Sequence, residues 1–147
     1  MEIREIESSE LAALLALYKH LHRKDDPLPG GGRVAAVWTA IQEDKNHRCY
    51  GVFVEGEMVA ACSLILVQNL TRGCRSYGVI ENVVTHEKYR RRGLGKAVLL
   101  YALEQAWATD CYKVMLMTGR KDPEINAFYT SAGFADDQKQ AFLARPV

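Results

Sequence analysis

A short basic segment with two glycines, followed at once by a long apolar stretch, constrains the fold of this chain more than any other feature. The segment runs from Arg90 to Lys96, and the apolar stretch continues to Trp107. The glycines let the backbone turn sharply and expose successive N–H groups at the N-terminus of a helix that we expect to begin near Leu94. The helix dipole and the nearby arginines favour an anion there. The sequence therefore predicts a loop that holds a pyrophosphate.

The familiar nucleotide-binding loops do not match this segment. A P-loop requires glycine where this chain has Arg90 and serine or threonine where it has Ala97, and a dinucleotide fingerprint requires glycine or alanine at Val98. The remaining pattern is Arg-x-x-Gly-x-Gly. The solvated start of an ordinary helix can look the same, so the sequence on either side of the loop has to decide between the two interpretations.

The flanking sequence predicts a strand, then a buried helix, then a second strand. Residues 76–85 form the first strand, and the helix after the loop has two apolar faces, so it is expected to cross a sheet. Residues 112–118 are nearly continuous in apolar character, which is typical of a strand inside a sheet. A right-handed crossover makes the two strands parallel. Asp122 is expected to cap the next helix, with Pro123 in its first turn and Gly133 at its end.

The rest of the chain predicts further strands that join their neighbours in sequence. A hairpin is expected at Glu55–Glu57, and its second strand should pair antiparallel with residues 76–85 across the loop 69–75. The fold class is therefore α/β (α+β), with a mixed, mostly antiparallel sheet flanked by helices. The other expected elements are a strand from Met1 to Arg4, a helix over 11–21 capped by Ser8 or Ser9, a helix over 34–41, strands over 50–55 and 58–67, and a last strand over 140–143.

Composition limits the classes of protein that this chain resembles. Its 147 residues, 48% of them hydrophobic, suffice for one domain with a real core, spanning 1–147. The net charge of +1 gives no general attraction to nucleic acid or to a membrane, and no apolar run approaches eighteen residues, so we expect the cytoplasm. Neither the histidines nor the cysteines have metal-ligand spacing. The cysteines lack a C-x-x-C pair, and Cys74 is the one expected to be exposed: Cys49, Cys62, Cys74 and Cys111.

Three segments in order resemble the GCN5-related N-acetyltransferases. The loop is similar to the family's Gln/Arg-x-x-Gly-x-Gly/Ala motif, Ile80–Thr85 is similar to its fourth strand, and Asn126–Phe134 is similar to its helix with a tyrosine and a closing Gly-Phe. The specific part covers residues 78–134. The resemblance implies an acetyltransferase fold that binds acetyl-coenzyme A, with no metal.

The resemblance also implies which residues hold this cosubstrate. Backbone N–H groups at Val83 or Val84 would polarise the acetyl carbonyl, and the loop backbone would hold the pyrophosphate. Many relatives have an asparagine seven positions before the tyrosine, where this chain has Asp122, so Asn126 is the alternative contact for the pantetheine arm. The expected cofactor-binding residues are Val83, Val84, Thr85, Arg90, Arg91, Arg92, Gly93, Leu94, Gly95, Lys96, Asn126 and Tyr129.

The chemistry of acyl transfer requires an acid and a base. Tyr129 aligns with the tyrosine that protonates the leaving thiolate in many relatives; a packed core aromatic is the alternative. Glu81 interrupts an apolar strand, and burial would suit it to work as a base, directly or through water, whereas a solvated strand glutamate is the other interpretation. Asn82 could orient the substrate. Arg72 and Arg75 could pair with a carboxylate or phosphate on the acceptor, or be solvated loop arginines.

These expectations amount to an acetyl-coenzyme-A-dependent N-acetyltransferase. The acceptor is expected to be a small, anionic primary amine that attacks directly in a ternary complex. The alternatives are acetylation of a protein or peptide and a non-catalytic acyl-coenzyme A sensor. Many relatives dimerise, and an exposed last strand would support a homodimer by edge pairing.

Overall fold

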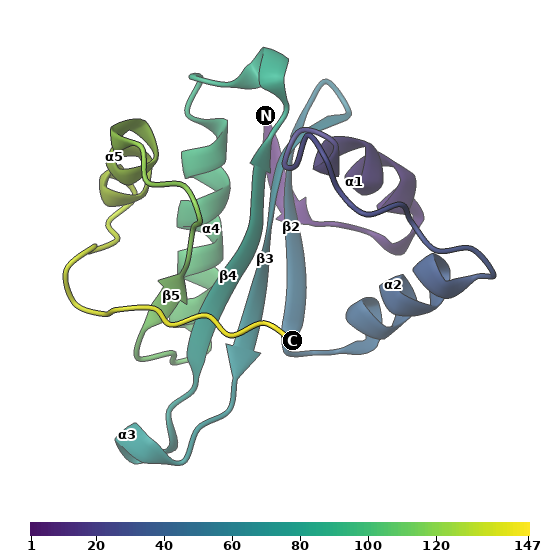
Figure 1. Cartoon of the computed structure of the whole chain (residues 1–147). Helices are drawn as coiled ribbons and strands as arrows, with labels where there is room; N and C mark the ends of the chain where they lie inside the picture. The colour runs from purple at the N-terminus through teal and green to yellow at the C-terminus, as the bar shows by residue number, and fades with distance from the viewer.

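One five-stranded sheet organises the computed structural model, which describes all 147 residues (Figure 1). The strand order is β1-β2-β3-β4-β5; the first four strands are antiparallel to their neighbours, and β4 and β5 are parallel. This confirms the expected mixed, mostly antiparallel sheet. The strands are β1 (Glu2–Glu5), β2 (His47–Val54), β3 (Glu57–Val67), β4 (Tyr77–Thr85) and β5 (Val114–Leu116); the helices are α1 (Leu11–Tyr18), α2 (Arg33–Glu43), α3 (Thr71–Cys74), α4 (Leu94–Ala108) and α5 (Pro123–Ser131), with 3-10 turns η1 (Ser8–Glu10) and η2 (Glu87–Tyr89).

The sheet has one apolar core on each face. On one face, α4 contributes Val98, Leu99 and Ala102 to the core, and strands β3 and β4 contribute Leu64 and Ile80. Helices α1 and α2 cover the other face, where their side chains meet a separate set of strand residues (Figure 1). Side chains alternate between the two faces along a strand, so each strand contributes to both cores. The second core contains Ile6, Leu14, Leu17, Trp38, Cys49, Phe53, Met58, Ala61 and Val84.

A bulge in β4 interrupts this alternation. Ile80 belongs to the core under α4 and Val84 to the core under α1, although residues four apart in a regular strand face the same side. The ladder with β3 shifts register here, and Asn82 has a φ of +52°. One extra residue therefore reverses the side-chain pattern and bends the strand. The bulge lies between the two halves of β4 that serve different cores.

The two ends of the sheet carry different structures. After β4, the chain passes over one end of the sheet and turns into α4, whereas the turn labelled α3 lies at the opposite end (Figure 1). In that turn Arg72, Gly73 and Cys74 have φ values of 55°, 69° and 62°, so three successive residues are left-handed. Non-glycine residues in this conformation cost about 1–2 kcal/mol each. The sequence analysis treated this segment as an ordinary loop.

Three local expectations are wrong. The first helical turn is not capped by Ser8 or Ser9, because the Glu10 carboxylate accepts the backbone N–H of Glu7 at 2.7 Å. Residues 140–143 form no strand: the chain after α5 has no strand, and Phe142 in that segment is 88% exposed. A strand needs a neighbouring edge, and no element pairs with this segment. Trp107, placed on an apolar face of α4, is half-exposed.

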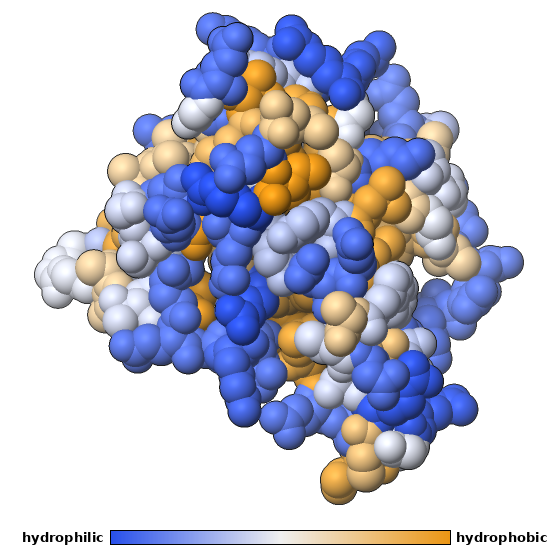
Figure 2. All heavy atoms as spheres, turned by 180° about the vertical axis from the view of Figure 1, so that it is seen from behind, coloured by the Kyte–Doolittle hydropathy of each residue, from blue (hydrophilic) through white to orange (hydrophobic).

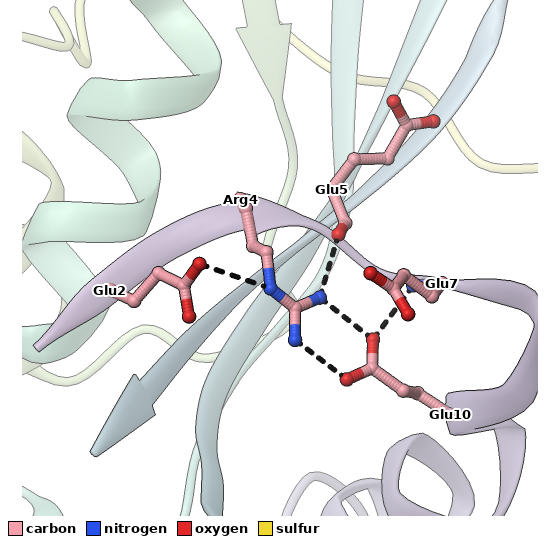
Figure 3. A network of polar contacts seen from close by, with 5 residues as sticks. All are labelled: Glu2, Arg4, Glu5, Glu7 and Glu10. Atoms are coloured by element: carbon pink, nitrogen blue, oxygen red, sulfur yellow. Dashed lines mark hydrogen bonds and ion pairs between the residues drawn. The ribbon is translucent and has the colours of Figure 1, made fainter. Parts of the chain in front are cut away.

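The first strand is joined to the first helix by a network around Arg4 (Figure 3). Its guanidinium donates to both carboxylate oxygens of Glu10, at 2.9 and 2.8 Å, and its Nε lies 3.4 Å from a carboxylate oxygen of Glu2. The same guanidinium stacks on the Phe53 ring, 3.9 Å from its centre. Hydrogen bonding to Arg4 is the main cause that lowers the pKa of the Glu10 carboxyl from its usual value of 4.5. The network fixes β1 against η1 without involving the loop before α4.

The surface is mostly polar. Figure 2 shows hydrophilic residues over most of the face seen from behind, with apolar residues mainly in its upper and central parts. Cys49, Cys62 and Cys111 are buried and Cys74 is exposed, as expected, and all four are free thiols. None of the helices has the length and apolar character that a membrane crossing requires.

Candidate functional site

The loop before α4 has the backbone conformation of an anion-binding turn. Arg91 and Gly93 are both left-handed, with φ values of +62° and +76°, and α4 begins at Leu94 as expected. Its first helical bond runs from Ala97 N to Gly93 O at 2.9 Å. The N–H groups of the first helical turn have no intrahelical acceptors, and the positive end of the helix dipole lies beside them. The segment can therefore hold a phosphate group by its backbone.

The two loop glycines are required for different reasons. A Cβ on Gly95 would lie 2.8 Å from Thr85 Oγ1 and 3.2 Å from Cζ of Phe128, so no side chain fits between the end of β4 and α5. A Cβ on Gly93 would meet nothing within 4 Å, but the positive φ there disfavours other residues. Gly95 thus brings the start of α4, the end of β4 and α5 together.

The basic side chains around the loop have different partners. Arg90 is engaged in the protein: its Nε donates to Thr85 O at 3.2 Å and its Nη2 to His20 O at 2.9 Å. Arg91 makes a 3.5 Å ion pair with Glu124 in which both side chains are highly exposed. Arg92 lies 5.1 Å from the centre of the Tyr89 ring. Such exposed contacts are weak, so Arg91 and Arg92 are free to turn toward an anion while Arg90 is not.

The edge of β4 becomes open next to this loop. Strand β5 pairs with β4 only from Gly78 to Ile80, so no strand lies on that side of residues 81–85. The bulge at Asn82 falls at the same place. The structure thus brings Val83, Val84 and Thr85 to an unpaired strand edge beside the N-terminus of α4. Val83 and Val84 are the two residues whose backbone N–H groups the family resemblance assigns to the acetyl carbonyl.

Tyr129 lies beside this opening. It is half-buried on α5, with its ring centre 4.9 Å from that of Phe128 and 6.3 Å from that of Phe134. Burial raises the pKa of the Tyr129 phenol; the positive charge of Arg120 partly offsets this rise, and the carboxylate of Glu81 adds to it. The phenol therefore keeps its proton at neutral pH. It also shares an electrostatic environment with Glu81, which comes from a different element.

Glu81 and Asn82 are exposed on the strand, so of the two interpretations left open for Glu81 the structure supports the solvated strand glutamate. Glu81 is the ladder partner of the buried Ser63 in β3, and its own side chain faces solvent. Alternation places Glu81 opposite in direction to Ile80, away from the core under α4. A carboxylate in this position can accept a proton through water.

The two candidates for the pantetheine arm both have protein partners. Asp122 caps α5 by accepting the N–H of Ile125 at 3.0 Å, and it also pairs with Arg120 at 3.0 Å. The hydrogen bond from the Ile125 N–H is the main cause that lowers the pKa of Asp122, and the contact with Arg120 lowers it further. The Asn126 amide donates to Asp136 at 3.0 Å. The expected cap is confirmed, and neither side chain is free in this arrangement.

Arg72 and Arg75 lie at the other end of β4. Arg75 precedes the strand, and Glu81 is six positions further along it, which corresponds to roughly 20 Å at 3.3 Å per residue. A small acceptor whose amine lies beside Glu81 does not extend over that distance. The structure therefore does not bring this pair of arginines to the same site as Glu81 and Tyr129.

Two neighbours of the site were missed by the sequence analysis. Arg120, between β5 and α5, acts on the Tyr129 phenol through its charge. Tyr18 falls at the same helical spacing as the apolar residues Leu11 and Leu14; it lies beside Ser63 and Asn82, and burial raises its pKa to about 12. Its helical spacing indicated burial correctly but gave no sign of these polar neighbours. Only the pairing of β3 with β4 brings them together.

The histidines have structural roles. His86 Nδ1 accepts the N–H of Lys88 at 3.2 Å and so caps η2. Its ring lies 4.0 Å from that of His20, centre to centre. The chain contains no group of three or more histidine, cysteine, aspartate or glutamate side chains that could hold a metal ion.

Comparisons with known proteins agree with this geometry. Residues 11–134 match the model of the acetyltransferase (GNAT) family. A glucosamine 6-phosphate N-acetyltransferase from Trypanosoma brucei brucei is 33% identical over 97% of this chain and 95% of that protein. Glucosamine 6-phosphate N-acetyltransferase 1 from Oryza sativa subsp. japonica is 33% identical over 60% of this chain, which covers 52% of that protein. A solved structure from Agrobacterium tumefaciens strain C58, provisionally named an acetyltransferase, has a TM-score of 0.92 and 40% identity over 99% of this chain and all of that one.

Proposed function

This chain belongs to the acetyltransferase (GNAT) family and is an acetyl-coenzyme-A-dependent N-acetyltransferase, and from this premise we propose that its acceptor is the primary amine of a hexosamine 6-phosphate. The observation that carries the proposal is the near full-length similarity to a protein named for glucosamine 6-phosphate. Such an acceptor is a small anionic amine, which is the class that the sequence analysis expected. The reaction would take place in the cytoplasm.

The residues around the loop fit the pyrophosphate of the cosubstrate. The left-handed backbone at Arg91 and Gly93 turns the chain sharply before α4, and Gly95 places no side chain at the start of the helix. Arg91, Arg92 and Lys96 add positive charge, whereas Arg90 holds the loop in place through Thr85 and His20. Acetyl-coenzyme A supplies an activated acetyl group and a thiolate that leaves when the amine takes that group.

The open edge of β4 would position the acetyl group. A backbone N–H of Val83 or Val84 would donate to the acetyl carbonyl oxygen, because the bulge turns the backbone here and no strand occupies this edge. Thr85 continues the same edge toward the loop. The side chains of Val83 and Val84 pack in opposite cores, which holds the backbone between them in one orientation.

Glu81 and Tyr129 would handle the two protons of the reaction. The exposed Glu81 carboxylate would take a proton from the acceptor ammonium through water, so that the neutral amine attacks the acetyl carbonyl carbon, and Asn82 next to it would orient the acceptor. Tyr129, whose raised pKa keeps it neutral, would give its proton to the departing sulfur. The shared environment of the two side chains supports their assignment to one reaction centre.

Steady-state kinetics with three acceptors tests the proposal. The thiol released from acetyl-coenzyme A is measured with glucosamine 6-phosphate, with glucosamine, and with a peptide that has a free N-terminal amine. We expect kcat/KM for the phosphorylated sugar to exceed that for glucosamine about 100-fold, because a charge-assisted contact to phosphate contributes about 1.5–3 kcal/mol. Equal kcat/KM values for both sugars would contradict the proposal that the acceptor is anionic. A preference for the peptide would indicate a protein or peptide acetyltransferase, and binding of acetyl-coenzyme A without turnover of any acceptor would indicate a sensor.

One variant tests the role of Glu81 within that reaction. Glu81→Gln should lower kcat about 100-fold if Glu81 is the base, since general base catalysis typically contributes that much. Unchanged turnover in Glu81→Gln would exclude this role. Size-exclusion chromatography with light scattering would establish whether the active form is the homodimer that the family resemblance suggested.

A further inference from the structure

Four basic side chains surround one hollow at the amino end of β4. Arg72, Arg75, Lys113 and Lys139, together with Tyr112, line a space of about 510 Å³. They come from the turn before β4, from the residues just before β5 and from the C-terminal tail. We propose that this hollow is a second anion-binding site, which takes a phosphorylated small molecule with at least two negative charges.

The positive charges of the hollow are largely uncompensated. Arg75 has the one acidic partner, an oxygen of Asp110 at 3.2 Å. Arg72, Lys113 and Lys139 make no ion pair, so four cations face one carboxylate, a local charge of +3 (4 − 1). Like charges held together repel each other, and a bound anion removes that repulsion. The whole chain has a net charge of only +1, so the excess is local, which fits a small ligand better than a nucleic acid.

Two of these side chains are already held in position. Arg75 donates from Nε to Asp110 O and from Nη2 to Cys111 O, both at 3.4 Å, which leaves its Nη1 without a protein partner. The ammonium of Lys113 lies 5.1 Å from the ring centre of Tyr77 and 5.2 Å from that of Tyr112. Cation–π contacts hold the ammonium and leave its N–H groups free to donate to phosphate oxygens. The cost of ordering these long side chains is therefore already met in the folded protein.

The turn that carries Arg72 is strained. Arg72, Gly73 and Cys74 all have left-handed backbone conformations. The thiol of Cys74 donates to Leu70 O across the turn at 3.7 Å. Strained backbone tends to persist where a site requires one side-chain direction. Here the strained residue lines the hollow. The left-handed backbone of Arg72 gives a reason why its side chain lies with the three other basic side chains that line the hollow.

This site is separate from the one that holds acetyl-coenzyme A. The loop before α4 follows the carboxyl end of β4. The hollow lies before the amino end of β4, at the opposite end of the sheet (Figure 1). An anion in the hollow would join the α3 turn, the start of β5 and the tail through Lys139. The inference therefore goes beyond the acetyl transfer proposed above and does not depend on the acceptor's identity.

Calorimetric titration of inorganic pyrophosphate into protein saturated with coenzyme A tests the proposal. Coenzyme A occupies the loop, so remaining pyrophosphate binding reports on other sites. We expect one pyrophosphate per chain and a Kd at least about tenfold weaker in Arg72→Gln/Lys113→Gln, since each charged hydrogen bond contributes about 1.5–3 kcal/mol. The matched control Lys19→Gln/Arg33→Gln removes the same charges elsewhere and should bind like the wild type. Uridine diphosphate and glucose 6-phosphate, titrated in the same way, show whether a nucleoside or a sugar accompanies the phosphate.

Three results would overturn the proposal: no pyrophosphate binding at all, binding that coenzyme A abolishes, or binding that Arg72→Gln/Lys113→Gln leaves unchanged. Unaltered affinity for coenzyme A in that variant shows that it is folded. If coenzyme A itself does not bind, the acetyltransferase mechanism fails separately. The hollow is then titrated in an Arg91→Gln/Arg92→Gln background, in which the charges of the loop are absent.

Discussion

The two ends of β4 carry basic clusters that are built in opposite ways. At the carboxyl end, the proposed pyrophosphate site would consist of the backbone of Arg91 and Gly93 and the start of α4, with the charged side chains only assisting. At the amino end, the hollow consists of side chains from three distant segments. A backbone site needs particular residues at fixed spacing because glycine and helix geometry determine it. A side-chain site can be assembled from any segments that the fold brings together, so it leaves no local pattern.

The largest effect is expected from a side chain at Gly95. In Gly95→Val, the added atoms would displace Thr85 and Phe128, which a Cβ alone already approaches to 2.8 and 3.2 Å. We expect binding of coenzyme A to weaken more than about 100-fold and the free energy of unfolding to fall by about 1–3 kcal/mol. Calorimetry and urea unfolding measure the two quantities.

Gly78→Ala is the matched change at the other end of β4. Its Cβ would lie 3.0 Å from Leu64 Cδ1 and 3.1 Å from Val114 Cγ2, which are ends of side chains that can shift. We expect a loss of about 1 kcal/mol and unchanged affinity for coenzyme A. Loss of coenzyme A binding in this variant would mean that the two ends of the strand are not independent.

The next largest effect concerns Tyr129. Tyr129→Phe should lower kcat about 100-fold with little change in coenzyme A affinity, because general acid catalysis typically contributes 10²–10⁴-fold. Burial raises the pKa of this phenol, so wild-type kcat should begin to fall only above pH 10, the usual tyrosine value, as the proton is lost. Tyr101→Phe, which alters a half-buried tyrosine packed on Tyr50, should retain full activity. A pH profile of kcat that is the same in wild type and Tyr129→Phe would refute the assignment.

A smaller effect is expected from the loop side chains. Arg91→Gln/Arg92→Gln keeps the backbone cradle and removes two exposed charges, so coenzyme A affinity should fall only about three- to tenfold at low salt. The difference should shrink at 1 M salt, where charges are screened within about 3 Å. Complete loss of binding would show that side chains and not the backbone make this site, which would remove the contrast with the hollow.

The smallest effect is expected from the Arg4 network, where the charges already have partners (Figure 3). Glu10→Gln should lower the free energy of unfolding by about 1 kcal/mol at pH 7. The pKa of Glu10 is lower in the folded protein than its usual 4.5, so its carboxylate stabilises the fold above that pH and the contribution disappears as the pH falls through the folded value. Urea unfolding of both proteins from pH 7 to pH 3 should show the difference closing. A constant difference would mean that lost packing, not charge, explains it.

Local signals in the sequence predicted most of the fold. Glycine and proline marked the hairpin at Glu55–Gly56 and both ends of α5, and apolar periodicity marked α4, so these elements were found with small errors in length. The strand expected over 112–118 is shorter in the structure, Val114–Leu116, because its pairing with β4 ends at Ile80. Apolar residues in 140–143 suggested a strand, but pairing is a property of two segments, and no second segment is present there.

The site was predictable to the extent that it depends on the backbone. The start of α4 at Leu94 follows from the glycines and apolar residues of that segment itself. The sequence left open whether Glu81 is buried or solvated, because the bulge and the neighbouring strand, not its own sequence, decide which way it faces. The charge of Arg120 near Tyr129 and the gathering of Lys139 with Arg72 depend on contacts across the whole chain.

The bond from Arg90 to the carbonyl of His20 makes the loop dependent on a part of the chain seventy positions away. A fragment that begins at β2 would keep every letter of the Arg-x-x-Gly-x-Gly signature and lose one of the two carbonyls that anchor its first arginine. For anyone who trims or recombines this protein, the boundary of a working unit lies well upstream of the motif that identifies it.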